Sequence, residues 1–143
     1  MKFHETEIRV RFYETDSWDM AWHGHYVGWF EAGRIALAKE FDLMPERFIE
    51  LGFYAPVISL KVDYKAIAGF DDLLVIHTAV RIPTKAALEF IYEARKKEDG
   101  KLVAAGETTQ VLVNMKGELV YIMPEPIRSR VNEMVKYCNG EAG

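Results

Sequence analysis

The chain has 143 residues, a formal net charge of −4 and one cysteine. That length is typical of one compact domain, so we expect a single domain over residues 1–143. The acidic balance disfavours a protein that binds nucleic acid through its phosphates. One cysteine excludes an intrachain disulfide, and the sequence has neither a long apolar run nor an apolar leader. We therefore expect a cytoplasmic protein without a membrane span.

The first part of the sequence changes from strand-like to helix-like spacing. Residues 3–13 alternate charged and apolar side chains, which predicts a strand with Phe12 on its apolar face. From about residue 24 to residue 41 apolar residues occupy almost every side of a helix, so other elements must wrap this helix. The segment PERFIELG, residues 45–52, predicts one or two further helical turns.

The remaining sequence is rich in strands. The predicted strands lie near residues 56–67, 72–82, 87–97, 102–114 and 118–122. Short turn-forming connections between them favour antiparallel pairing. Residues 125–140 predict an amphipathic terminal helix. This order of elements predicts an α+β fold in which a curled antiparallel sheet wraps the central helix.

Such an arrangement leaves sheet edges and an outer apolar face without cover. A second copy of the chain is the simplest way to bury them. We therefore expect a homodimer or a dimer of dimers, the latter being a homotetramer.

The stretch FYETDSWDMAWHGHYVGWFEAGR, residues 12–34, concentrates side chains that can carry out chemistry. Asp16 has an ordinary interpretation as a turn residue that accepts a hydrogen bond from its own backbone, and Asp19 can cap a helical turn. His23 and His25 form an H-x-H pair that is compatible with a divalent metal. No third ligand can be named elsewhere in the chain, so we expect neither a metal nor another cofactor.

Two carboxylates are of interest near the buried helix. Glu31 either pairs with Arg34, three residues later, or with a partner subunit, or it is a buried carboxylate with a chemical role. Asp16 precedes the N-terminus of the helix, where free N–H groups and the helix dipole favour negative charge. A carboxylate beside N–H donors suits acyl transfer, because it can attack or activate water while the donors bind the oxyanion.

The same stretch resembles the opening of the hotdog-fold acyl-CoA thioesterases of the 4-hydroxybenzoyl-CoA thioesterase type, including their Tol-Pal-associated relatives. In that family an Asp follows an aromatic strand, a Tyr comes ten residues later, and an aromatic-Glu-x-x-Arg run lies in the helix. Asp16, Tyr26 and FEAGR stand in those places. The resemblance continues through VDYKAIAGFDDLLVIHTAV and GKLVAAGETTQVLVNMKGELVYIMPEPIR. Two positions depart from the pattern, because Asp19 replaces a usual Gly and Ile67 a frequent Pro.

The resemblance implies a hotdog fold and hydrolysis of an acyl-CoA thioester to a free acid and CoA. Asp16 matches the catalytic carboxylate of the family, as nucleophile or as general base. His23 matches a position whose backbone N–H lies beside the thioester carbonyl. The residues matched to substrate-binding positions are Tyr26, Glu31, Lys65 and Lys85. The two lysines suit the phosphates of CoA, although both are equally compatible with solvated turns.

Two other functions stay open on the sequence. A hotdog dehydratase or hydratase acts on carbon–carbon bonds of acyl thioesters, but its typical His and Asp motif is not seen in the helix region. A non-catalytic acyl-CoA-binding protein or a structural oligomer can share the same fold, because a fold does not fix a function. Release of free CoA from a panel of acyl-CoAs separates a thioesterase from both.

Overall fold

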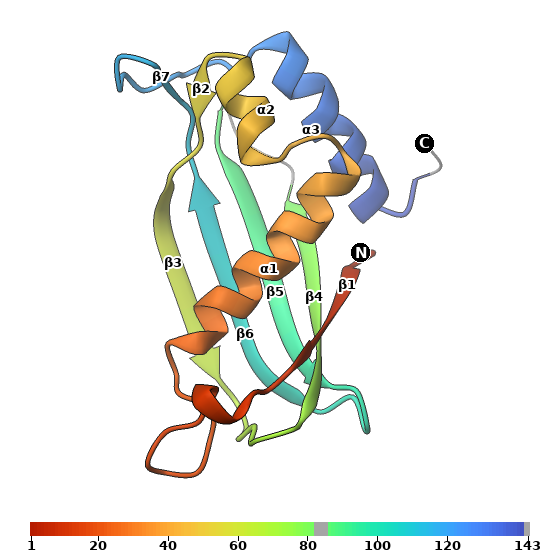
Figure 1. Ribbon diagram of the computed structural model, residues 1–143. Coiled ribbons are helices and arrows are strands. Elements are labelled where there is room, and N and C mark those ends of the chain that lie inside the picture. Colours follow the sequence, from red (N-terminus) through yellow and green to blue (C-terminus); the bar gives the residue numbers. More distant parts are fainter. Residues whose placement is uncertain (82–85, 142–143) are drawn as a thin grey trace.

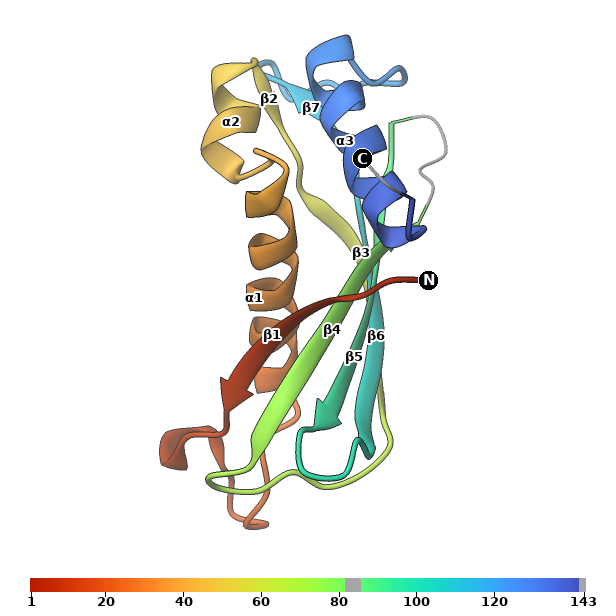
Figure 2. The same ribbon diagram turned by 90° about the vertical axis from the view of Figure 1, so that its right-hand side faces the viewer.

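The computed structural model describes residues 1–81 and 86–141. Its main feature is a five-stranded antiparallel sheet, in the order β1-β4-β5-β6-β3, with helix α1 across one face (Figures 1 and 2). The strands of this sheet are β1 (His4–Arg9), β3 (Val57–Tyr64), β4 (Leu73–Arg81), β5 (Leu88–Lys96) and β6 (Leu102–Gln110). A small second sheet pairs β2 (Phe53–Tyr54) with β7 (Val113–Asn114). The helices are α1 (His25–Glu40), α2 (Pro45–Glu50) and α3 (Glu125–Cys138), and a 3-10 turn, η1 (Phe12–Glu14), follows β1.

Helix α1 fills the concave side of the sheet. Its buried residues are Tyr26, Trp29, Phe30, Gly33, Leu37 and Ala38. Gly33 permits the close crossing, because a Cβ atom there would lie 2.5 Å from Thr78 Oγ1 and 2.8 Å from Ile76 Cγ2 of β4. The predicted α+β hotdog fold, a curled antiparallel sheet around a central helix, is confirmed.

A stacked aromatic pair fills the core beneath the first half of α1. The rings of Phe30 and Tyr92 lie 4.8 Å apart at an angle of 12°, and both residues are buried. The Tyr92 hydroxyl is 2.6 Å from Thr108 Oγ1, so this buried polar group is satisfied. Gly106 makes room for the pair, since a Cβ atom there would lie 2.6 Å from the Phe30 ring.

Most predicted elements are present within a few residues of their expected bounds. The alternation predicted for β4 is confirmed by four buried side chains, Leu74, Ile76, Thr78 and Val80. The terminal helix α3 buries its predicted apolar face, which consists of Ile127, Val131, Met134, Val135 and Cys138. Within the two described ranges, no helix is long and apolar enough to cross a membrane.

Two predictions about strands were wrong. The first strand ends at Arg9, and Phe12 is 75% exposed instead of lying on the buried face. The physical reason is that Glu14 Oε1 accepts the Arg11 N–H (2.9 Å), which closes the 3-10 turn. Residues 118–122 form no strand, because their hairpin partner β7 has only two residues and pairs with them through the single bridge Val113–Leu119.

Strand β3 is an edge of the sheet with exposed apolar side chains. One side of β3 pairs with β6, and no other described strand pairs with its second side. Its exposed large apolar residues are Val57, Ile58, Leu60 and Tyr64. Figure 1 shows β3 as the outer strand farthest from β1. This edge has unpaired backbone groups as well as apolar surface.

Candidate active site

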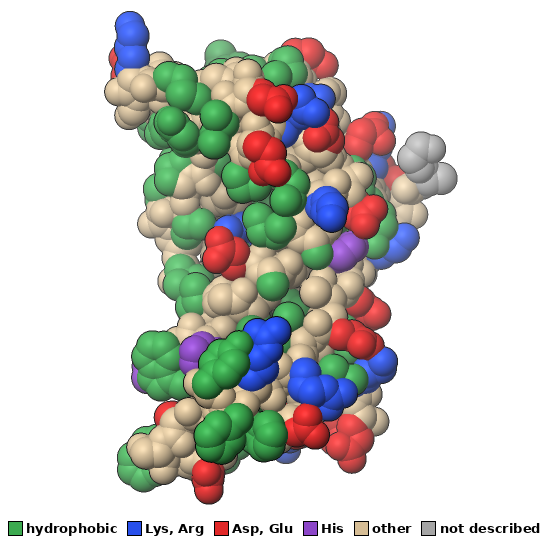
Figure 3. Space-filling model, viewed as in Figure 1, with side chains coloured by type: hydrophobic (Ala, Val, Ile, Leu, Met, Phe, Trp, Pro, Cys, Tyr) green, Lys and Arg blue, Asp and Glu red, His purple; other side chains and the backbone are tan. Residues whose placement is uncertain are grey.

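An open pocket of about 390 Å³ lies where the loop after η1, the start of α1 and the end of β3 meet. The residues in its wall that matter for the chemistry are Asp16, Trp18, His23, Tyr26, Tyr64 and Lys65. Four of the six predicted site residues therefore line one pocket, although they come from separate parts of the sequence. Figure 3 shows hydrophobic side chains gathered around histidine at the lower left, over the start of α1.

The loop between η1 and α1 holds Asp16 in a tight turn. Its N–H donates to the Met20 carbonyl (2.9 Å), and its own carbonyl accepts the Asp19 N–H (3.0 Å). The carboxylate oxygen Oδ1 accepts the Trp18 N–H (2.8 Å). The other oxygen, Oδ2, accepts no hydrogen bond from the described residues. Asp16 is therefore a turn residue, as its ordinary interpretation predicts, and it still has one carboxylate oxygen available for chemistry.

Asp19 occupies the position where the resembled family usually has glycine. Its φ of 61° lies in the left-handed region, which glycine adopts freely and aspartate adopts more readily than most residues. The loop therefore has a glycine-like backbone despite the substitution. Ile67, the second departure, is exposed and lines the same pocket as Asp16.

The start of α1 supplies hydrogen-bond donors beside this pocket. Gly24 is the N-cap, and the His25 N–H donates to the Trp22 carbonyl (3.0 Å). In the described part of the chain, the N–H groups of His23 and Gly24 have no acceptor. The positive end of the helix dipole adds to their attraction for negative charge. Tyr64 donates its hydroxyl to the His23 carbonyl (2.5 Å), which fixes this turn to the end of β3.

Sequence reasoning missed the role of Glu14, a carboxylate that is only 7% exposed. Its Oε2 accepts the Trp29 indole N–H (2.8 Å), and its Oε1 accepts the Arg11 N–H (2.9 Å). Its backbone carbonyl also accepts the Trp22 N–H (2.9 Å). These bonds fasten the segment just before Asp16 to α1. No local pattern announces the contact, because Trp29 lies fifteen residues later.

Tyr26 presents a neutral hydroxyl to the pocket. Burial raises its pKa from 10.0 to about 12, and the nearby Tyr64 and Asp72 act in the same direction. Its ring packs edge-on against two others, with centroid separations of 4.7 Å to Trp29 and 5.2 Å to Tyr64. Tyr26 therefore keeps its proton at neutral pH and can donate a hydrogen bond.

The remaining predicted residues differ in their relation to the pocket. Glu31 is 62% exposed and its Oε1 lies 3.4 Å from Arg34 Nη2, which is the ion-pair alternative, so we leave Glu31 out of the site. Lys65 lies at the pocket wall, and Lys85 lies outside the described residues. Over residues 1–81 and 86–141, no group of three or more His, Cys, Asp or Glu side chains is arranged to hold a metal ion.

Comparison with known families identifies the chain. The model of the thioesterase-like superfamily matches residues 9–131. The chain belongs to this superfamily. The family predicted from the motif around Asp16 is thereby confirmed at the level of the thioesterase-like superfamily.

A bacterial protein of known name resembles part of the chain. A Bacillus subtilis (strain 168) protein named "Putative acyl-CoA thioesterase YneP" is 32% identical over 78 residues. The matched region covers 54% of this chain and 56% of that protein, so the chain spans little more than half of that relative.

Two solved structures share the fold of the chain over most of their length. The hypothetical protein TT1821 from Thermus thermophilus is 28% identical, with a TM-score of 0.81 over 91% of this chain and 98% of that one. The DHNA-CoA thioesterase from Staphylococcus aureus is 22% identical, with a TM-score of 0.84 over 100% of this chain and 98% of that one. At 22% identity, the similarity to the Staphylococcus aureus protein shows a shared fold alone.

Proposed function

We propose that this protein is an acyl-CoA thioesterase, which hydrolyses an acyl-CoA to a free acid and CoA. One observation carries the proposal. Asp16, whose Oδ2 accepts no hydrogen bond from the described residues, lines the same pocket as His23, and in the described part of the chain the N–H groups of His23 and Gly24 lack acceptors. Membership of the thioesterase-like superfamily and the name of the Bacillus relative support the same reaction.

We assign one role in this reaction to each group. The thioester carbonyl oxygen accepts hydrogen bonds from the His23 and Gly24 N–H groups, which stabilise the negative charge of the tetrahedral intermediate. Asp16 Oδ2 either attacks the carbonyl carbon or takes a proton from the water that attacks it. The C–S bond then breaks, and CoA leaves as a thiolate whose conjugate thiol has a pKa of about 8.5, so the reaction does not demand a strong general acid. When Asp16 is the nucleophile, water then hydrolyses the acyl–Asp16 anhydride, which releases the free acid and restores the carboxylate.

Neighbouring residues position the reacting groups. The Trp18 N–H holds Asp16 Oδ1, which leaves the second oxygen available for chemistry. Tyr26 borders the reacting centre with a neutral hydroxyl. Lys65 at the wall is available to the phosphates of CoA. Lys85 as a second phosphate contact and the cytoplasmic location both stay predictions.

The kinetic test compares Asp16→Asn with Asp19→Asn. Asparagine at position 16 keeps the acceptor for the Trp18 N–H but removes the charged oxygen, so we expect kcat to fall by roughly a hundredfold or more. Asp19→Asn removes a neighbouring charge in the same loop and should lower kcat much less. Turnover is measured as CoA released, with a thiol reagent, from a panel of aliphatic and aromatic acyl-CoAs.

Two results would count against this assignment. Near-normal turnover by Asp16→Asn, together with loss of activity in Asp19→Asn or Glu31→Gln, would move the catalytic carboxylate elsewhere. No CoA release by the wild-type protein from any acyl-CoA would favour a non-catalytic binder or a dehydratase instead.

We also propose that two copies associate along β3. Its unpaired edge and its exposed apolar side chains are the features that a second sheet edge would cover. Sedimentation at micromolar concentration should give a dimer or a dimer of dimers. Leu60→Lys on β3 should weaken this association, whereas Ile122→Lys, at an exposed position outside the strands, should not. A stable wild-type monomer would refute the proposed interface.

A further inference from the structure

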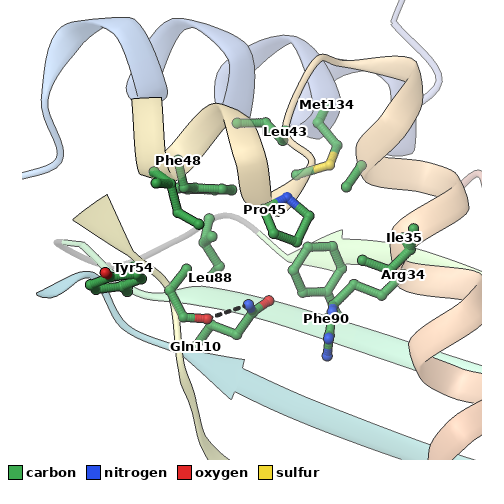
Figure 4. A pocket seen from close by; sticks show the side chains of 13 residues that line it. Arg34, Ile35, Leu43, Pro45, Phe48, Tyr54, Leu88, Phe90, Gln110 and Met134 are labelled. Atoms are coloured by element: carbon green, nitrogen blue, oxygen red, sulfur yellow. Dashed lines mark hydrogen bonds between the residues drawn. The ribbon is translucent and has the colours of Figure 1, made fainter. Parts of the chain in front are cut away.

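A second cavity, of about 110 Å³, lies toward the other end of α1, beneath α2 (Figure 4). The apolar side chains that shape it are Ile35, Leu43, Phe48, Leu88, Phe90 and Met134. None of its lining residues lines the Asp16 pocket. Along α1, Phe30 lies between Tyr26 of that pocket and Arg34 of this cavity, and its stack with Tyr92 fills the intervening core. The cavity is therefore a separate site.

Among the described residues that line this cavity, Arg34 is the one charged residue. Its side chain is only 12% exposed, and Figure 4 shows it reaching from α1 toward the strands beside Phe90. Its ion-pair partner among the described residues is Glu31, at 3.4 Å and largely in solvent. The Arg34 guanidinium also lies near the buried Tyr92 hydroxyl, which is a neutral group. A guanidinium has five N–H donors, so these two contacts leave most of the donors without a charged acceptor. A nearly buried cation in this state favours an anionic partner.

We propose that this cavity binds a short-chain alkyl or aryl carboxylate. The apolar walls fit the hydrocarbon body, and the planar guanidinium of Arg34 fits a carboxylate through two parallel hydrogen bonds. An apolar cavity of about 150 Å³ is known to admit benzene, so the smaller volume found here suits a body of about four or five carbons. The same chemical class includes the acid released by a thioesterase. Binding in the Arg34 cavity is nevertheless independent of hydrolysis in the Asp16 pocket.

The test is a ¹H–¹⁵N NMR titration of the full chain with hexanoate and, separately, with the uncharged 1-hexanol. We expect hexanoate to bind at least tenfold more tightly, with shifts at cavity residues such as Ile35 and Met134. Arg34→Gln should lower the hexanoate affinity by about tenfold to a hundredfold, the range for hydrogen bonds to a charged group, and should leave hexanol binding unchanged.

Three matched variants separate the effect of the Arg34 charge from those of its ion pair with Glu31 and of the cavity volume. Glu31→Gln removes the ion-pair partner but keeps the cation, so hexanoate affinity should be retained or rise. Arg128→Gln breaks an ion pair of the same i,i+3 type on an exposed helix face and should have no effect. Ile35→Phe narrows the cavity from a half-buried position and should weaken both ligands, which keeps the test valid if Arg34→Gln does not fold.

Three results would overturn the proposal. The first is no hexanoate binding by the wild-type protein, as expected if a second copy of the chain fills the cavity. The second is equal affinity for hexanoate and hexanol that Arg34→Gln does not change. The third is a set of shifts confined to the Asp16 pocket, for instance at His23 and Lys65.

Discussion

Replacement of Glu14 by leucine should destabilise the protein because it removes a buried double acceptor. The Trp29 indole N–H, on a residue that is only 5% exposed, would lose its acceptor at 2.8 Å. Loss of a charge-assisted bond to a buried donor costs about 1.5–3 kcal/mol. The Arg11 N–H would also lose its acceptor, but it lies on an exposed residue and water can replace it, at a cost of about 0.5–1 kcal/mol.

The two contributions give a loss of about 2–4 kcal/mol in the free energy of unfolding. For a chain of this length, each kcal/mol lowers Tm by about 3 °C, so a drop of about 6–12 °C is expected. Urea unfolding followed by tryptophan fluorescence measures the free energy, and Tm comes from circular dichroism. All samples need the same protomer concentration, because the stability of an oligomer depends on it.

A double-mutant cycle with Trp29→Phe isolates the carboxylate–indole bond. Trp29→Phe removes the N–H donor, so Glu14→Leu should cost less in that background than in the wild type. Equal costs in both backgrounds, or a loss below about 0.5 kcal/mol for Glu14→Leu alone, would refute the view that this bond holds the loop on α1.

Two further predictions concern the core and the pH dependence of stability. Gly33→Ala should destabilise by about 1–3 kcal/mol, because its Cβ would press against Thr78 and Ile76; an unchanged urea midpoint would show that α1 can move away from β4. The raised pKa of Tyr26 means that unfolded chains ionise this group first, so stability is unaffected below about pH 10 and falls as the pH rises from about 10 to about 12. Urea midpoints measured across that range should fall less in Tyr26→Phe than in the wild type.

Periodicity predicted the elements that bury one continuous face. Strand β4 and helix α3 each carry a repeating apolar pattern that packing then satisfies, whereas helix α1 was predicted from apolar residues on almost every side. The motif around Asp16 also led to the correct superfamily. These inferences succeeded because the signal lies within one segment of the chain.

The parts that sequence reasoning missed depend on contacts between distant residues. Phe12 was expected on a buried face, but the hydrogen bond from Arg11 to Glu14 turns the chain before it. The hydroxyl of Tyr64 reaches the His23 carbonyl across 41 positions, which no local pattern can announce. By contrast, the local pair of Glu31 with Arg34, one of the alternatives that the sequence left open, is present on the exposed side of α1.

The direction of β3 has a consequence for hybrid assemblies. Tyr64, at the end of β3, lines the Asp16 pocket, whereas Tyr54 and Ala55, just before its start, line the Arg34 cavity. Two identical edges related by a two-fold axis pair antiparallel, so in the proposed dimer each copy sets its pocket beside the cavity of the other. Consider a heterodimer in which one chain has an altered Asp16 pocket and the other has an altered Arg34 cavity. The two altered sites would then lie side by side at one end of the dimer. The opposite end would then combine an intact pocket with an intact cavity.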